Sequence, residues 1–348
     1  MKIVSVVPFY SSGLNNCFFD NKNIYNFPYE LKKHFELNEF QVNTVDISPI
    51  KHSDFILMFD LKLKYILSML FQGKLNKCIY ISFEPPSVYS LHEPLVLKVL
   101  SNLFFSVLTW QDEIVDDKSI FKFYFPMPKV QKITNDLSFN EKKLLTTVVG
   151  YKTSTHPDEL YSKRVDAILF FEQHIPKQFD FYGAGWDESR YQCYRGKVDS
   201  KLETMAKYRF TLCYENQHSI KGLISEKIFD CFHAKSIPIF WGASNIEKYI
   251  PADCFVDKRE FPTYESLLNY LSSMTEEEFG HRIKAINKYL LSDEYKLHSS
   301  ENFSQNLYSV LNRTTDTVPF YKHILPIIHL TYLKIIYKLR KKIIQLNR

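Results

Sequence analysis

The stretch from Tyr208 to Phe261 reads YRFTLCYENQHSIKGLISEKIFDCFHAKSIPIFWGASNIEKYIPADCFVDKREF. Its apolar and polar runs predict a strand, a polar loop, a helix, a strand, a turn and another strand. Ser225 is a suitable N-cap for the helix, and Glu226 and Lys227 follow it in the first turn. Because a helix start attracts anions through its free N–H groups and its dipole, this arrangement suits a sugar-nucleotide diphosphate. A solvated Glu–Lys pair in an ordinary first turn is the alternative.

The rest of the chain also alternates strands with helices. In the first part, strands are expected at 2–9, 40–47, 54–60, 77–85 and 105–110, and helices at 29–37, 63–71 and 91–103. In the second part, strands are expected at 144–150, 179–183, 209–215, 236–242 and 254–261, and helices at 157–171, 200–208, 225–234 and 264–274. This pattern predicts an α/β fold of two Rossmann-like domains that face a central cleft. The predicted domains are 1–135 and 144–310, separated by the polar segment 131–143.

Composition and charge exclude some classes of function. The formal net charge of +5 over 348 residues is too small to indicate a nucleic-acid partner. The six cysteines form no C-x-x-C pair, which favours reduced core thiols in a cytosolic protein. The first ten residues, MKIVSVVPFY, predict a buried strand, since their apolar run is too short for a signal peptide. No run reaches the roughly 18 apolar residues of a membrane span, so we expect a cytoplasmic protein with peripheral membrane contact at most.

The opening stretch resembles the donor-binding signature of glycosyltransferase family 10, the α-1,3/1,4-fucosyltransferases, of bacterial type. The matching elements, in chain order, are Glu215-Asn216, Ser225-Glu226-Lys227, Ile237-Pro238-Ile239, Gly242 and the segment 251–256. A weaker resemblance covers about 78–275. It implies a GT-B fold, GDP-L-fucose as the donor held by the second domain, and inversion at the anomeric carbon. The chain departs from the family pattern at Leu223, where relatives often have a tyrosine.

The resemblance also assigns roles to single residues. It implies that Lys227 and Arg164 neutralise the donor diphosphate, whereas the alternative for Arg164 is a solvent-facing side chain. We expect Asn216 and Glu226 to bind hydroxyl or base groups of the donor, and Ser225 and Lys152 to complete the donor site. Glu84 lies at the carboxyl end of the strand expected at 77–85 and is the expected general base that deprotonates the acceptor hydroxyl. The alternative for Glu84 is a solvent-exposed residue at the end of a strand.

Other polar residues carry weaker signals. We interpret the loop histidines His92, His156 and His218 as surface residues, because a lone loop histidine is more often exposed than catalytic. There is no D-x-D triplet placed to bridge a metal to a diphosphate. We therefore expect no metal site and no required cofactor, with Lys227 and Arg164 as the leaving-group stabilisers. The sequence leaves open whether a divalent cation stimulates turnover.

The C-terminal segment 318–348 is apolar at helical spacing and, from Tyr332 on, has six basic residues and no acid. This predicts a basic amphipathic helix on an anionic membrane surface, although a helix packed on the protein would share its apolar stripe. The sequence as a whole predicts an inverting fucosyltransferase at the inner face of the membrane. Its acceptor would be a hydroxyl, such as the 3-OH of N-acetylglucosamine, on a cell-surface glycan such as lipopolysaccharide O-antigen. The alternatives are a different sugar nucleotide in the same fold, and a carbohydrate-binding protein without turnover.

Overall fold

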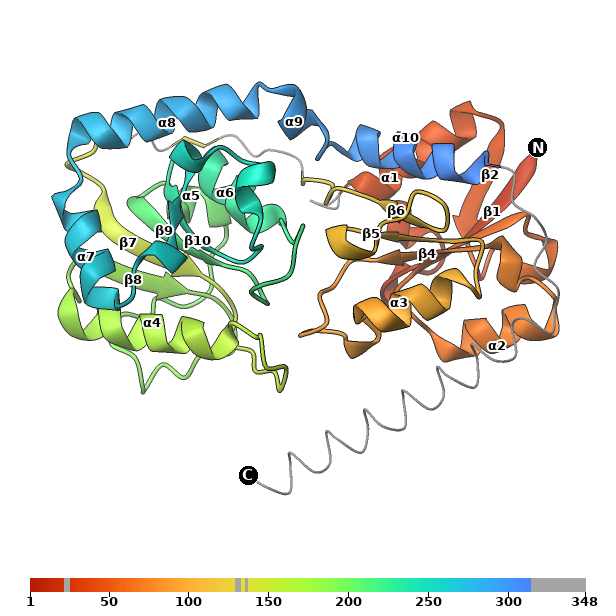
Figure 1. The fold of residues 1–348 in the computed structure, drawn as a ribbon, viewed down its shortest axis with the longest axis horizontal. Helices are drawn as coiled ribbons and strands as arrows, with labels where there is room; N and C mark the ends of the chain where they lie inside the picture. Colours follow the sequence, from red (N-terminus) through yellow and green to blue (C-terminus); the bar gives the residue numbers. More distant parts are fainter. Residues whose placement is uncertain (22–25, 129–132, 135–136, 314–348) are drawn as a thin grey trace, which may run out of the picture. The chain divides into compact units, whose positions relative to one another are not determined.

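The computed structural model describes residues 1–21, 26–128, 133–134 and 137–313. They form two compact units (Figure 1). Unit 1 comprises Met1–Lys129 and the chain from Leu297 on, and unit 2 comprises Val130–Lys296. The predicted amphipathic tail, 318–348, lies outside the described residues. No helix in the described part of the chain combines the length and the apolar character that crossing a bilayer requires.

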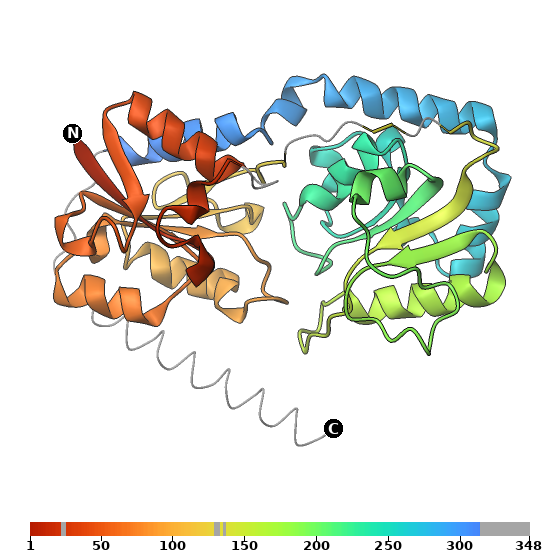
Figure 2. The same cartoon turned by 180° about the vertical axis from the view of Figure 1, so that it is seen from behind.

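Unit 1 contains a six-stranded parallel sheet in the order β2-β1-β3-β4-β5-β6. Its strands are β1 (Lys2–Val7), β2 (Phe40–Thr44), β3 (Phe55–Phe59), β4 (Cys78–Ser82), β5 (Ser106–Thr109) and β6 (Ile120–Lys122). Its helices are α1 (Phe27–Leu37), α2 (Leu63–Phe71), α3 (Pro94–Ser101) and α10 (Ser300–Leu311). Helices α1 and α10 cover one face of the sheet, and α2 and α3 cover the other (Figure 2). The strands therefore read as continuous apolar runs, because both of their faces are buried.

Unit 2 contains a five-stranded parallel sheet in the order β11-β10-β9-β7-β8. Its strands are β7 (Lys143–Val148), β8 (Phe179–Tyr182), β9 (Tyr208–Tyr214), β10 (Ile237–Trp241) and β11 (Val256–Asp257). Its helices are α4 (Tyr161–His174), α5 (Lys201–Met205), α6 (Glu226–His233), α7 (Tyr264–Ser273), α8 (Glu276–Leu290) and α9 (Asp293–Lys296). Helices α5, α6 and α8 lie on one side of this sheet and α4 on the other (Figure 1). Both units are thus Rossmann-like, as predicted.

Each sheet has one point at which the chain reverses the direction in which it adds strands. In unit 1 this point lies between β1 and β3, and in unit 2 it lies between β7 and β9. Ligands of open α/β sheets bind beyond the carboxyl ends of the strands that flank such a point. The loops that follow β3, β7 and β9 are therefore where a ligand is expected.

Two predicted elements of unit 2 differ from the structure. Helix α4 begins at Tyr161 and not near Pro157, because the Glu159 carboxylate accepts the N–H groups of Tyr161 and Ser162 and so caps the helix there. The strand predicted at 254–261 is only two residues long. It ends because the side chain of Asp257 accepts the N–H of Arg259 and starts a 3-10 turn.

The predicted second domain, 144–310, also ends too late, because α10 belongs to unit 1. The Phe303 ring lies 5.3 Å from the ring of Phe27 and 5.8 Å from that of Phe83, measured between centroids. The side-chain amide of Asn306 donates to the carbonyl of Lys122 over 2.7 Å. These contacts complete the core of unit 1 with residues from the far end of the described chain.

The cysteines are all unpaired, and five of the six are buried, as expected of core thiols. Cys17 is the exception, since it is exposed.

Candidate functional site

The start of α6 is built as the sequence predicts. Ser225 is the N-cap, with an extended backbone, and its hydroxyl accepts the N–H of Lys227 over 3.5 Å. The pair Glu226-Lys227 forms the first turn, where the helix has free N–H groups. Both of their side chains are partly buried, so the pair is not an ordinary solvated one.

Glu215, at the end of β9, is the residue that organises this helix start. It is 1% exposed, and its Oε1 accepts both the N–H of Ser225 (3.0 Å) and its hydroxyl (2.6 Å). Its Oε2 lies 2.8 Å from Nζ of Lys227. The same Nζ donates to the Ser225 hydroxyl over 3.0 Å. The sequence motif alone does not indicate a role for Glu215, because its partner Lys227 lies twelve residues away, on α6.

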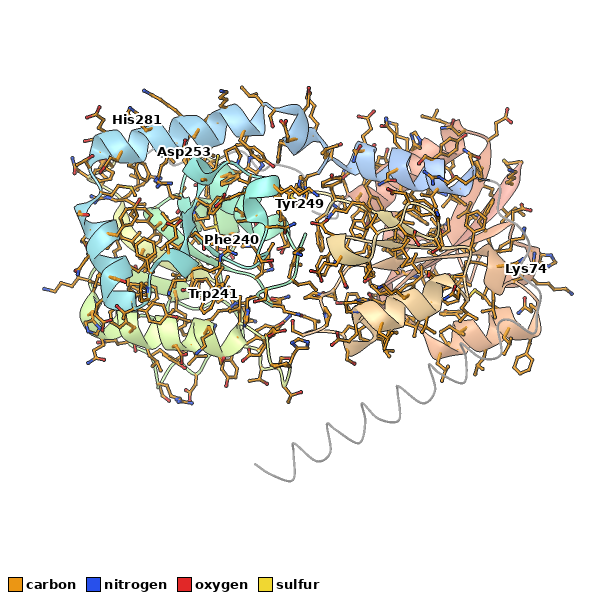
Figure 3. The ribbon with its side chains drawn as sticks, in the orientation of Figure 1. Lys74, Phe240, Trp241, Tyr249, Asp253 and His281 are labelled. Atoms are coloured by element: carbon orange, nitrogen blue, oxygen red, sulfur yellow. The ribbon has the colours of Figure 1, made fainter. Side chains whose placement is uncertain are left out.

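Gly242 makes room for Glu215. A Cβ atom at position 242 would lie 2.7 Å from Cγ of Glu215 and 2.7 Å from Cζ of Phe240, which is closer than van der Waals contact allows. The glycine that ends the run IPIFWG is therefore required by packing at this site. Phe240 and Trp241 of the same strand are labelled in Figure 3.

Charges of both signs surround the helix start. Lys201 lies 2.5 Å from Asp230 on α6, and it also interacts with Glu226. Burial opposes the charge of Lys227, but the neighbouring Glu215 and Glu226 carboxylates raise its pKa above the usual value. Burial likewise opposes the charge of Glu226, but Lys227 and Lys201 hold its pKa below the usual value. Lys227 and Glu226 therefore favour each other's charged forms, within a cluster of two lysines and three acids.

Arg164, on α4, lies beneath the end of β9 and not in solvent. It is 7% exposed, and its Nη2 donates to the carbonyls of Tyr214 and Glu215, each over 2.8 Å. The same nitrogen donates to Oδ1 of Asn216 over 2.9 Å. Burial lowers the pKa of this guanidinium. In this arrangement Arg164 positions the loop after β9, and a direct contact with phosphate stays a prediction.

The loops that follow β7 and β9 are joined to each other. The carbonyl of Asn216 accepts the N–H of Leu160 over 3.2 Å, and the carbonyl of Asp158 accepts the N–H of His218 over 3.0 Å. These two loops flank the strand-order reversal of unit 2, so Asn216 lies where a ligand is expected. Lys152 lies exposed in the loop after β7, and no contact of its side chain places it beside Lys227.

An aromatic surface that sequence reasoning missed adjoins these loops. The ring of His218 stacks on that of Trp241, with centroids 6.0 Å apart and planes 28° from parallel. Nζ of Lys258 lies 5.4 Å from the Trp241 centroid, and burial lowers the pKa of this lysine. Trp241 is only partly buried, so its ring could stack with a flat ligand. In the sequence, the signal for this aromatic surface is the position of Trp241 as the last residue of a strand.

Leu223, the departure from the family pattern, is 1% exposed. Its side chain therefore belongs to the core of unit 2.

In unit 1, Glu84 follows β4 at the carboxyl edge of the sheet. The backbone around it is held on two sides: Nε1 of Trp110 donates to the Phe83 carbonyl over 2.8 Å, and Nδ1 of His92 lies 2.5 Å from the Glu84 carbonyl. Glu84 itself is partly buried.

His92 contradicts the prediction of a surface residue. It is 0% exposed, and its Nε2 lies 2.5 Å from the Tyr80 hydroxyl. Burial lowers the pKa of His92 to about 4, so the imidazole is neutral at physiological pH.

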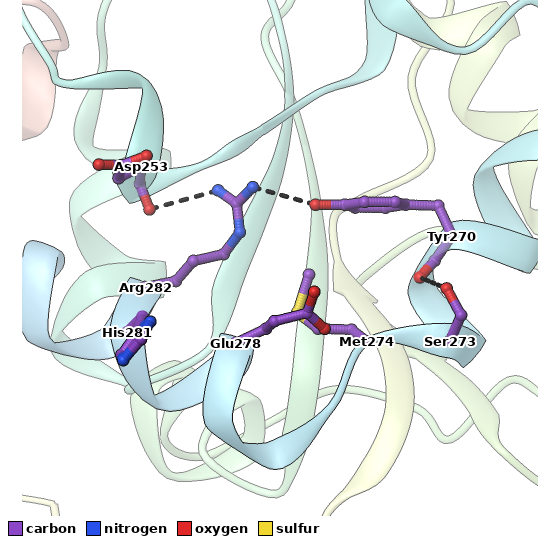
Figure 4. A pocket seen from close by; sticks show the side chains of 7 residues that line it. All are labelled: Asp253, Tyr270, Ser273, Met274, Glu278, His281 and Arg282. Atoms are coloured by element: carbon purple, nitrogen blue, oxygen red, sulfur yellow. Dashed lines mark hydrogen bonds between the residues drawn. The ribbon is translucent and has the colours of Figure 1, made fainter.

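A pocket of ≈ 330 Å³ lies elsewhere on unit 2, beside the amino end of β11 (Figure 4). Its lining residues are Asp253, Tyr270, Ser273, Met274, Glu278, His281 and Arg282. The Arg282 guanidinium is already bound by the carbonyl of Phe255 (2.8 Å) and the hydroxyl of Tyr270 (3.0 Å). The pocket lies at the wrong end of the strands for the donor.

Within the described ranges, no three His, Cys, Asp or Glu side chains are grouped closely enough to hold a metal ion.

A comparison with known proteins identifies the protein family that unit 2 resembles. Residues 140–300 match the model described as glycosyltransferase family 10 (fucosyltransferase) C-term. The chain carries a glycosyltransferase family 10 domain. All six predicted donor-site residues lie inside the family 10 match, whereas Glu84 lies outside it.

Relatives of known function share a short segment of this chain. It is 32% identical over 74 residues to the Alpha-(1,3)-fucosyltransferase FucT of Helicobacter pylori, covering 21% of this chain and 15% of that protein. It is 36% identical over 75 residues to 4-galactosyl-N-acetylglucosaminide 3-alpha-L-fucosyltransferase 9 of Mus musculus, covering 21% of each. The chain thus matches well under a quarter of the length of these relatives.

The fold likeness extends over most of the chain. A crystal structure of an alpha1,3-fucosyltransferase covers 90% of this chain and 91% of its own, with a TM-score of 0.58 and 14% identity. The same comparison with an alpha1,3-fucosyltransferase bound to GDP-fucose gives a TM-score of 0.53 over the same shares at 14% identity. The fold is therefore GT-B, with two Rossmann-like domains.

Proposed function

We propose that this chain is an inverting glycosyltransferase that moves L-fucose from GDP-fucose to a hydroxyl group of a glycan. The observation that carries the proposal is the helix start in which Glu215, Ser225 and Lys227 bind one another, inside a family 10 domain. The complex of a structural neighbour with GDP-fucose supports the choice of donor.

Lys227 is the centre of the proposed donor site. Its ammonium has three N–H donors, of which two bind Glu215 and Ser225. The side chain is 19% exposed, so the third donor can reach a bound anion. This donor and the free N–H groups of α6 supply the attraction for the diphosphate.

The other predicted donor residues surround Lys227. Glu226 binds sugar or ribose hydroxyls, and Asn216, held by Arg164, presents its amide to the donor. Arg164 supports the leaving diphosphate through this loop, and Lys152 adds positive charge from the loop after β7. This scheme requires no metal or other cofactor, and it is compatible with stimulation of turnover by a divalent cation.

The proposed reaction is a single displacement. The acceptor oxygen forms a bond to the anomeric carbon of fucose while the bond from that carbon to the β-phosphate oxygen breaks. GDP leaves with the electron pair, and the Glu84 carboxylate takes the proton of the acceptor hydroxyl. Attack from the face opposite the leaving group inverts the anomeric configuration.

We also propose the acceptor and the location. The acceptor is a cell-surface glycan such as lipopolysaccharide O-antigen, with the 3-OH of N-acetylglucosamine as the favoured hydroxyl. The basic tail 318–348 would hold a cytoplasmic protein against the inner face of the membrane, as its six basic residues from Tyr332 on suggest. Sedimentation with anionic vesicles, before and after deletion from Tyr332, tests this separately from activity.

A panel of sugar nucleotides tests the function. The purified protein is incubated with each donor, with and without glycan acceptors, and both nucleotide release and the anomeric configuration of the product are measured. Acceptor-dependent release of GDP from GDP-fucose, with an inverted product, is expected. Nucleotide release only from another donor would show that the transferred sugar is not fucose. Binding without nucleotide release would favour a carbohydrate-binding protein without turnover.

A further inference from the structure

Three buried polar atoms lie at the carboxyl ends of neighbouring strands in unit 1. They are Oδ1 of Asp60 after β3, Oγ of Ser82 at the end of β4 and Oε1 of Gln111 after β5. None has a hydrogen-bond partner among the described residues. Ser82 is 0% exposed and Gln111 is 2% exposed. Because a native fold rarely leaves buried polar groups unpaired, such a group points to function.

Asp60 is also at the place where a ligand is expected. It directly follows β3, one of the two strands that flank the strand-order reversal of unit 1. The register pairs Phe59 with Ile81, so Asp60 lies on the strand next to the one that leads to Glu84. Both carboxyl groups therefore come from the same edge of the sheet.

The backbone of Asp60 is unusual. Its φ is +63°, a left-handed conformation that aspartate and asparagine tolerate better than other side chains. Asp117, which is exposed, has a similar φ of +55° elsewhere in unit 1.

His92 explains why Asp60 has no hydrogen-bond partner. The Glu84 carbonyl can only accept, so Nδ1 of His92 carries the proton of the neutral ring. Nε2 then accepts from the Tyr80 hydroxyl and has no proton to give. Accordingly, Oδ1 of Asp60 lies 3.7 Å from this Nε2, beyond hydrogen-bond distance.

The electrostatics agree with this geometry. Burial, and after it the charge of Glu84, raises the pKa of Asp60 to about 7, although Lys62 opposes the shift. The titratable groups that face Asp60 are Lys62, Tyr80, Glu84, Tyr89 and His92. Coupling between two sites is reciprocal, so the charge of Asp60 must raise the proton affinity of Glu84 equally.

We propose that Asp60 is a positioning residue that acts through Glu84: the two carboxyl groups form a pair, and the charge of Asp60 strengthens Glu84 as a base towards the acceptor hydroxyl. The proposal rests on the proposed function of Glu84. Above neutral pH both carboxylates are ionised, and their repulsion is relieved when Glu84 takes the proton of the acceptor.

Carboxyl NMR on the full chain, labelled in aspartate and glutamate side chains, tests the pair without donor or acceptor. We expect Asp60 to titrate near neutral pH, and its midpoint to fall by about one pH unit or more in Glu84→Gln. In the reciprocal variant, Asp60→Asn, the midpoint of Glu84 should fall. Asp117→Asn, which also retains the left-handed backbone, should move neither. Unmoved midpoints in both variants, or a wild-type midpoint of Asp60 below about 5, would overturn the pair.

The pH profile of transfer tests the consequence. The wild-type rate should rise through neutral pH as Asp60 ionises, whereas Asp60→Asn should lose this rise and be about 3- to 10-fold slower at pH 8. A rise that survives in Asp60→Asn rejects the role of Asp60. The NMR titrations need no turnover, so they test the pair even if the protein transfers no fucose. Coupled titrations without fucose transfer would reject the proposed function and leave the pair standing.

Discussion

Nζ of Lys227 lies 2.8 Å from Oε2 of Glu215, and this ion pair joins the end of β9 to the first turn of α6. The carboxylate is buried, and it also holds the Ser225 N–H and hydroxyl. The pair therefore sets the direction of a side chain that we expect to bind the donor.

Removal of the buried partner should destabilise the protein. Glu215→Gln leaves Lys227 without its counter-charge, and we expect the free energy of unfolding to fall by about 2 to 4 kcal/mol. Denaturant unfolding measures this. Glu188→Gln, at an exposed position, should change stability by less than about 0.5 kcal/mol. Equal stability of the two variants would show that the ion pair contributes little.

Donor affinity should depend on Lys227. Lys227→Ala removes the third N–H donor, so the Kd for GDP should rise about tenfold or more, as measured by calorimetry. Lys177→Ala, which removes an exposed lysine after α4, is the control and should bind GDP as the wild type does. Unchanged GDP affinity in Lys227→Ala would contradict the phosphate contact.

The close approach of Gly242 to Glu215 gives a matched pair of glycine variants. Gly242→Ala should lower the free energy of unfolding by about 1 to 3 kcal/mol, because its Cβ would lie 2.7 Å from Cγ of Glu215. Gly280→Ala, within α8, meets no atom within 4 Å and should stabilise the helix by about 0.5 to 1 kcal/mol. Thermal unfolding of both variants decides whether space or backbone freedom explains the glycine at 242.

Substitution of Glu84 should abolish transfer without weakening donor binding. Glu84→Gln cannot accept the acceptor proton, so transfer should fall by about 100-fold or more while the Kd for GDP-fucose stays within about twofold. Glu113→Gln, on the 3-10 turn after β5, serves as the control. A large loss of donor affinity in Glu84→Gln would argue for a binding role.

Asp60 should make stability depend on pH in a specific direction. Its pKa is raised from 3.8 to about 7 on folding, so between these values the folded state holds a proton that the unfolded chain has lost. Wild-type stability from this group therefore falls as the pH rises from about 4 to 7. Asp60→Asn removes this loss of stability at higher pH. The Tm of the variant minus that of the wild type should therefore be larger at pH 8 than at pH 5, by the equivalent of about 1 to 3 kcal/mol. A difference in Tm that does not vary with pH would contradict this.

Most strands and helices could be predicted from the sequence, because strands buried on both faces read as apolar runs and helices as apolar spacings of three and four. Where prediction was wrong, a side chain decided the outcome locally. Glu159 delays the start of α4, and Asp257 ends β11 after two residues.

The site was predictable only in part, for a related reason. Ser225 and Lys227 are neighbours in the sequence, so their helix start carries a local signal. The roles of Glu215 and His92 depend on partners that are brought close by folding: α6 for one, and Tyr80 and Asp60 for the other. No local pattern distinguishes a buried loop histidine such as His92 from an exposed one.

The packing of α10 on unit 1 has a consequence for how the chain is made. The ribosome releases residues 1–129 long before it makes Phe303, which packs on Phe27 and Phe83. At usual rates of synthesis, translation of 130–296 takes roughly 10 to 30 s, during which the face of unit 1 that α10 will cover is bare. Unit 2 is contiguous and can fold as soon as it emerges. The nascent segment 1–129 is therefore the part of this protein that we expect to need a chaperone.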